Sequence, residues 1–165
     1  MKFIETLFLG ILVACTALIA QVFITVIAEL FFRTSLTFQY SFTDSLYHVG
    51  LLMAIAASIE EVLRYIIIKK RTIHHVSGIS SIFVYGSLLG IGFASFEMFL
   101  ALLGHTISIH DMFMIIPVFA VHITLSIFLL FFIKSENETV RDIPFLITSI
   151  ILHTASNLTL FYFLT

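Results

Sequence analysis

Two adjacent carboxylates and an arginine lie inside an otherwise apolar stretch of this sequence. Glu60, Glu61 and Arg64 belong to the segment EEVLR, and four apolar residues separate Arg64 from the basic cluster at 69–71. In a helix, Arg64 lies one turn beyond both glutamates and can pair with either of them. An ion pair needs only one carboxylate, and a second one beside it makes it harder for both to be charged. The pattern is typical of a general base, and a buried ion-pair network is the competing interpretation.

Three further apolar stretches carry side chains of the kind that catalysis uses. Glu97 ends the segment FASFE, His122 lies in the next stretch, and HTASN supplies His153 and Asn157. Along ideal helices from the expected cytoplasmic ends, the depth is about 13–16 Å for Glu60 and the two histidines, and about 25 Å for Glu97. Four helices therefore offer polar groups at overlapping depths, which predicts a shared polar cavity.

Small residues precede Glu97 at helical spacing. Gly86, Gly90, Phe93 and Glu97 follow one another at intervals that place them on one helix face. A stripe of glycines allows a neighbouring helix to approach closely. We therefore expect Glu97 to point into an interface between helices.

The residue types favour hydrolysis without a protein nucleophile. A carboxylate can activate water, and His and Asn side chains can stabilise an oxyanion. A serine mechanism is an alternative because Ser126, Ser149 and Ser156 are near histidines, but no GxSxG segment occurs. No HExxH segment occurs either, so no cofactor is expected; a zinc ion held by His122, His153 and a glutamate is the weaker alternative.

Membrane helices must position these residues. Of the 165 residues, 60% are hydrophobic and only 11% are charged, and the mean hydropathy is +1.14; soluble domains are about 25% charged. Polar breaks leave five stretches near the length that a membrane helix needs. The sequence predicts an all-α polytopic bundle with a polar intramembrane cavity, one integral membrane domain over 1–165. The expected spans are 4–31, 45–68, 80–103, 112–133 and 143–164.

Charge predicts orientation and partners. Six Lys and Arg residues outside the spans lie on the side of the N-terminus, and only Arg33 lies on the other side. The positive-inside rule then predicts a multi-pass protein of the cell membrane with a cytoplasmic N-terminus and an external C-terminus. The net charge of −2 argues against nucleic acid as a partner. The expected partners are the lipid bilayer and a membrane protein or lipidated peptide as substrate.

The chain resembles the superfamily of CAAX prenyl proteases and bacterial Abi (CPBP) proteins in four successive segments. These are, in chain order, EEVLR (60–64), FASFE (93–97), His122 and HTASN (153–157). The motifs of these glutamic-type intramembrane proteases are EExxxR, FxxxH and HxxxN, each on its own helix. The variants EExxR and FxxxE are more similar to the PrsW and YhfC branch. The resemblance covers residues 45–165 as a protease-like core and implies that the first helix is peripheral.

The resemblance also implies roles for single residues. Glu60 would be the base that polarises water, with Glu61 in support, and His153 with Asn157 would bind the oxyanion. Glu97 stands where the prenyl proteases have a second water-binding histidine, which departs from their pattern.

Two other classes of protein remain open. A scaffold subunit within the superfamily organises partners, so a non-catalytic scaffold or immunity protein is the first alternative. A small transporter is the second, because intramembrane carboxylates also mark ion paths. The sequence shows no inverted repeat and no paired Gly/Pro-broken helices, which argues against transport.

Overall fold

The structure is a computed structural model that describes residues 2–32, 42–103, 109–135 and 139–164. Over these residues it contains five long helices, one short 3-10 turn and no strand, so the predicted all-α bundle is confirmed. The elements are α1 (Lys2–Phe32), α2 (Phe42–Lys70), η1 (Thr72–His75), α3 (Ile79–Leu103), α4 (Ile109–Ser135) and α5 (Thr139–Leu164).

Each helix coincides with one predicted span. The largest difference at any end is four residues, at the start of α5 (139 against 143). Within the described residues, four segments are long and apolar enough to cross a membrane: Lys2–Ile27, Ile79–Leu103, Ile115–Lys134 and Asp142–Tyr162. The protein is therefore a multi-pass membrane protein. The remaining helix, α2, is as long as the others but carries the EEVLR charges.

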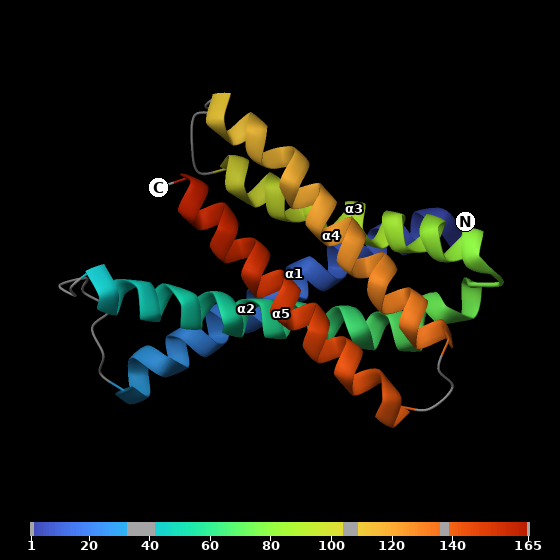
Figure 1. Cartoon of the computed structure of the whole chain (residues 1–165), viewed down its shortest axis with the longest axis horizontal. Helices are drawn as coiled ribbons and strands as arrows, with labels where there is room; N and C mark the ends of the chain where they lie inside the picture. Colours follow the sequence, from blue (N-terminus) through green and yellow to red (C-terminus); the bar gives the residue numbers. More distant parts are fainter. Residues whose placement is uncertain (1, 33–41, 104–108, 136–138, 165) are drawn as a thin grey trace.

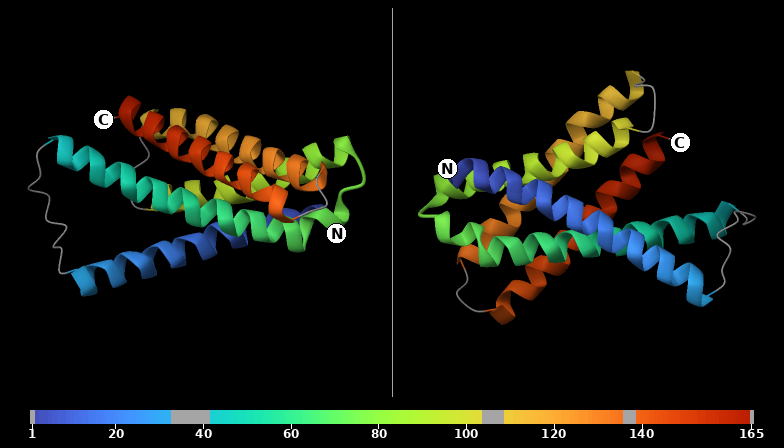
Figure 2. Two further views of the ribbon diagram at one scale, coloured as in Figure 1. Left: turned by 60° about the horizontal axis from the view of Figure 1, so that its bottom comes forward. Right: turned by 180° about the vertical axis from the view of Figure 1, so that it is seen from behind.

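The helices form three layers. α2 and α3 lie in the middle, α4 and α5 cross over one face of them, and α1 crosses the opposite face (Figures 1 and 2). The start of α1, the turn η1 and the start of α5 lie at one end of the bundle, whereas α5 ends at the other (Figure 1). Consecutive helices thus run in opposite directions, as expected for repeated crossings of a bilayer.

Glycines allow α3 to pack closely on both of its neighbours. A Cβ added at Gly90 would lie 2.5 Å from the Cα of Ile123, and Gly86 faces Ile127 in the same way, so α4 lies directly on the predicted glycine stripe. On the other side of α3, a Cβ at Gly92 would lie 2.1 Å from the carbonyl oxygen of Leu7. The two helix backbones touch there, as small residues permit in membrane bundles.

The first helix, which the resemblance implies to be peripheral, packs closely on the rest of the bundle. α1 packs against α3 as extensively as α4 does. Gly10 of α1 meets the backbone of α3 so closely that any side chain would clash with the carbonyl oxygen of Leu89. α1 is therefore an outer layer that packs closely on α3 and can contribute to the site.

A second polar cluster joins α2 to α5 at the end of the bundle where η1 lies. The Nζ atom of Lys69 is 2.5 Å from the Oδ2 atom of Asp142, and the Tyr65 hydroxyl donates to the same oxygen over 3.0 Å. Asp142 is buried. This cluster fixes where α5 begins relative to α2, and so sets the register of the site deeper in the bundle.

Candidate functional site

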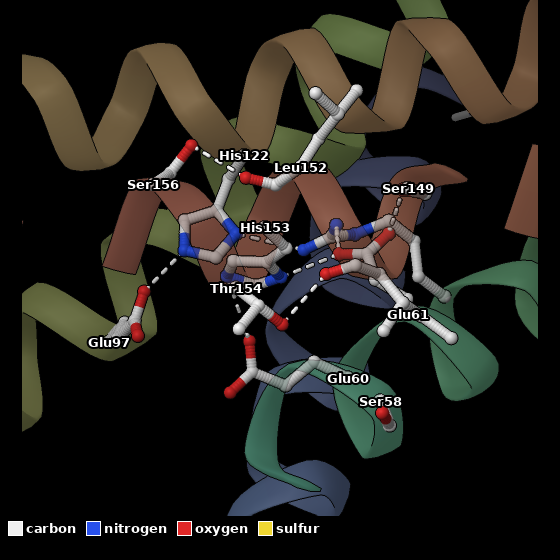
Figure 3. Close-up of polar contacts among 12 residues, drawn as sticks. Ser58, Glu60, Glu61, Glu97, His122, Ser149, Leu152, His153, Thr154 and Ser156 are labelled. Carbon is white, nitrogen blue, oxygen red and sulfur yellow. Dashed lines mark hydrogen bonds and ion pairs between the residues drawn. The ribbon is translucent and has the colours of Figure 1, made fainter. Parts of the chain in front are cut away.

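Glu61 is the centre of a hydrogen-bond network and joins α2 directly to α5. Its carboxylate is fully buried and pairs with the Arg64 guanidinium one turn further along α2. The Ser149 hydroxyl donates to Oε2 over 2.6 Å, and Nδ1 of His153 lies 2.8 Å from Oε1 (Figure 3). A carboxylate with a cation and two further donors around it is fully satisfied. Glu61 therefore anchors the network.

The hydrogen bonds of His122 define its protonation. Arg64 approaches its Nδ1 atom at 2.8 Å, and its Nε2 atom lies 2.5 Å from the Oε2 atom of Glu97. A guanidinium can only donate, so Nδ1 of His122 accepts and the single ring proton is on Nε2, which donates to Glu97. Because both nitrogens are engaged in this way, His122 is a neutral imidazole. Phe93 stacks on this ring at 4.4 Å and lies under the Arg64 guanidinium at 4.5 Å.

His153 and Glu60 face each other across a gap that no hydrogen bond fills. The Glu61 carboxylate only accepts, so the proton of a neutral His153 is on Nδ1. Its Nε2 atom then lies 3.5 Å from the Oε2 atom of Glu60. Both atoms are buried and neither has a hydrogen-bond partner among the described residues. Two lone pairs this close repel each other, and one proton bound between the two atoms would remove this repulsion.

Gln21 of α1 is a member of the site that the sequence interpretation missed. Its amide Nε2 donates to the Oε1 atom of Glu60 over 2.9 Å, and this bond turns Oε2 of Glu60 toward His153. The available signal was an amide within an apolar membrane span, where polar side chains seldom lie without a partner.

Glu60 and Glu97 line one cavity of about 140 Å³ between α1, α2 and α3. Gln21 is the third polar side chain of its wall, and the rest is apolar, including Leu18 and Phe96. Glu60 is only 7% exposed, whereas the Glu97 side chain is 43% exposed. A volume of this size holds several water molecules, so reactive carboxylate oxygens and water can meet in an otherwise apolar space.

The structure thus brings together five of the six predicted site residues, with Arg64 as the predicted ion-pair partner. Asn157 is half-buried, one turn beyond His153 on α5, and makes no hydrogen bond with a described residue. The serines do not form a nucleophile and base pair. Ser149 donates to Glu61, Ser156 donates to the backbone of its own helix, and the buried hydroxyl of Ser126 has no described partner.

The residues do not fit the zinc alternative. Glu60, His122 and His153 do offer ligand atoms within 4.8 Å of one another. A zinc ligand is a neutral imidazole that donates its other N–H to an acceptor. His122 instead receives a hydrogen bond from Arg64 at Nδ1 and has its proton on Nε2, so a metal at either nitrogen would displace a bonded partner. We therefore derive no step through a metal.

No protein-family model, curated protein or solved structure matches this chain. The assignment of a function therefore depends on the geometry of the site and on the motifs themselves.

Proposed function

We propose that this protein is an intramembrane endopeptidase that hydrolyses a peptide bond of a membrane-embedded or lipidated substrate. The observation that carries the proposal is the pair of buried, unpartnered atoms, Oε2 of Glu60 and Nε2 of His153, together with the cavity between α1, α2 and α3 that Glu60 also lines. Because one proton can bind between these two acceptor atoms, the pair can act as a base that takes a proton from water.

The reaction needs only water and these groups. A water molecule in the cavity gives a proton to the pair of Glu60 and His153 while its oxygen attacks the carbonyl carbon of the substrate. When the tetrahedral intermediate collapses, the C–N bond breaks and the same proton passes to the leaving nitrogen. One water is consumed, and the products are a carboxylic acid and an amine.

Glu61 and Arg64 support this chemistry without touching the substrate. Glu61 accepts from Nδ1 of His153, which orients the ring and stabilises its protonated form. Arg64 neutralises Glu61, so that the added proton binds in the gap between His153 and Glu60. His153 has no second N–H to offer while it is neutral, so we assign it to proton transfer and not to the oxyanion.

The amide of Asn157 is the proposed oxyanion donor. It lies on α5 one turn from His153 and is not engaged by a described residue. Loss of one such donor reduces the rate by about 10²–10³-fold, and we expect this effect for Asn157→Ala with little change in thermal stability.

The sequence motifs are consistent with the proposed peptidase function. They resemble those of the CAAX prenyl protease superfamily, and the motif residues Glu60 and His153 each have one buried atom without a described partner. Glu97 occupies the motif position of the second water-binding histidine of the prenyl proteases. Its carboxylate accepts a hydrogen bond from the Nε2–H group of His122 and lines the cavity. The site of this chain is thus a carboxylate variant of that pattern.

The proposed setting is a bilayer crossed by all five helices, with the N-terminus cytoplasmic and the C-terminus external. The charges of α2 are internal to the bundle, where Glu61 and Arg64 are fully buried. A cysteine placed at the exposed Ser77 should be labelled only from the cytoplasmic side. Labelling of this position from outside would reverse the orientation.

The direct test is hydrolysis by the full chain in lipid vesicles. Peptides with a transmembrane segment or a lipid anchor are incubated in ¹⁸O-water, and mass spectrometry detects new termini with one ¹⁸O. We expect Glu60→Gln to lower the rate by about 10²–10⁴-fold, the usual contribution of a general base. Glu5→Gln is the matched control because Glu5 is half-exposed and far from the cavity wall.

The competing function is a scaffold. The observation that favours it is that both oxygens of the Glu61 carboxylate accept hydrogen bonds within the protein, because a network of this kind is sufficient to hold helices together without any catalysis. Glu60→Gln separates the two functions. A variant that folds and retains full biological function refutes the peptidase and supports the scaffold.

A further inference from the structure

The buried network is short of positive charge. Its three carboxylates carry three negative charges and Arg64 carries one positive charge, which leaves −2 while both imidazoles are neutral. No other charged side chain of the described part of the chain bonds to the network. An uncompensated charge in such a place costs several kcal/mol, so a cation or a proton must complete the site.

Protons at the two histidines and in the gap supply only part of the missing charge. His122 cannot take a second proton because Arg64 donates to its Nδ1 atom. The gap between Glu60 and His153 takes one proton, since a second would set two donors against each other over 3.5 Å. With that one proton the network still has a charge of −1, which Glu97 carries while its carboxylate is ionised.

The remaining charge faces the cavity. Glu97 lines the cavity with its side chain 43% exposed, and Glu60, which has one buried oxygen without a described partner, is also a residue of its wall. The rest of the wall is mainly apolar and includes Leu18, Phe93 and Phe96. An apolar pocket with two carboxylates matches a ligand that has an ammonium group on an apolar body.

We propose that this cavity binds an organic monocation, with its ammonium between Glu60 and Glu97 and its apolar part against α1 and α3. The extension to substrates depends on the proposed peptidase function: the cleaved segment would then have a lysine side chain or a free N-terminus next to the scissile bond. The volume of about 140 Å³ suits one side chain of this size.

Binding is tested with n-hexylammonium and its neutral analogue n-hexanol. The full chain in a non-ionic detergent is titrated with each probe, and calorimetry and thermal unfolding are measured. We expect hexylammonium to bind at least about tenfold more tightly than hexanol, and Glu97→Gln to remove this preference. Glu5→Gln should leave it unchanged. Equal binding of both probes, or a response to Zn²⁺ in place of hexylammonium, overturns the proposal.

A lysine built into the cavity tests the same charge deficit without a ligand. Leu18 lines the cavity, whereas its neighbour Ile19 is 64% exposed on the outer surface of α1. Leu18→Lys should be at least as stable as the parent and should no longer respond to hexylammonium. Ile19→Lys, the matched control, should lower the unfolding temperature. If both lysines destabilise the protein equally, the cavity does not attract a cation.

Paired peptides distinguish this inference from the proposed function. Two substrates differ only by lysine or norleucine next to the cleaved bond, and norleucine has the same length without the ammonium. Cleavage that prefers lysine by at least about tenfold supports both. Cleavage without preference and without probe binding refutes the cation site and leaves the peptidase in place. Probe binding without any cleavage supports the site and refutes the peptidase.

Discussion

Arg64→Leu is the sharpest test of how the site is held together. The guanidinium is fully buried and is the only cation bonded to the network among the described residues. It pairs with Glu61, donates to Nδ1 of His122 and lies over the ring of Phe93. Leucine fills part of the same space but supplies neither the charge nor the donors. The variant therefore leaves a buried carboxylate without its counter-charge.

The expected loss is large for a single substitution. Removal of one partner of a buried ion pair costs about 3–5 kcal/mol. The orphaned Nδ1 atom of His122 would add about 1–3 kcal/mol if it were independent, but both effects arise from one group and do not add fully. At roughly 2–4 °C per kcal/mol for a chain of this length, the unfolding temperature should fall by about 6–20 °C.

The assay is thermal unfolding in one detergent for a small set of variants. Arg71→Leu is the matched control because Arg71 is exposed, and it should stay within about 0.5 kcal/mol of the parent. Glu61→Gln keeps the acceptor and the shape but removes the charge that needs Arg64. The double variant Arg64→Leu/Glu61→Gln should therefore be more stable than Arg64→Leu alone. No such recovery, or a loss below about 1 kcal/mol for Arg64→Leu, would refute the argument from charge pairing.

Three further predictions follow from the packing and from the site. Gly92→Ala should lose about 1–3 kcal/mol of stability, because its Cβ would lie 2.1 Å from a carbonyl oxygen of α1, whereas Gly78→Ala, with no atom within 4 Å of the new Cβ, should be neutral in the same unfolding assay. Lys69→Met should lower the unfolding temperature because it strands the buried Asp142, and Lys70→Met on the exposed neighbour should not. Neither EDTA nor Zn²⁺ should change the unfolding temperature or the rate of any hydrolysis, because a metal bound to His122 would displace Arg64 or Glu97. A loss of activity with EDTA that Zn²⁺ restores would contradict this prediction.

The helices could be predicted from the sequence because a bilayer imposes a simple length rule. Polar residues end each apolar run, and every observed helix end lies within four residues of the predicted one. The predicted glycine stripe at Gly86 and Gly90 is confirmed by the close approach of α4. Helical spacing alone decides which residues share such a face, so no tertiary information was needed.

Relative depth could not be predicted as well. Counted along straight, parallel helices, Glu97 lies about 9 Å deeper than His122, yet the two side chains are hydrogen-bonded over 2.5 Å. α3 and α4 cross at an angle, so distance along a helix does not measure depth in the bundle (Figure 1). The long glutamate side chain covers part of the remaining difference.

The hydrogen-bond partners of the polar groups could not be predicted from the sequence either. Gln21 was missed because the resemblance begins at residue 45, and its role depends on the close crossing of α1 with α3. The choice between the two adjacent glutamates likewise needed coordinates. Glu61 is bonded to Arg64 and to two residues of α5, whereas Glu60 lines the cavity and is bonded to α1.

The order in which the partners of α2 occur along the chain has a consequence for biosynthesis. Glu61 and Arg64 depend on His122 of α4 and on Ser149 and His153 of α5. A growing chain presents α2 long before those helices exist, and each charge costs about 2.5–3.5 kcal/mol at the centre of a membrane helix. In the proposed arrangement of five membrane-spanning helices, stable insertion of α2 therefore waits for α5. Translation products that stop before residue 149 should leave α2 at the membrane surface and should be degraded as unassembled protein.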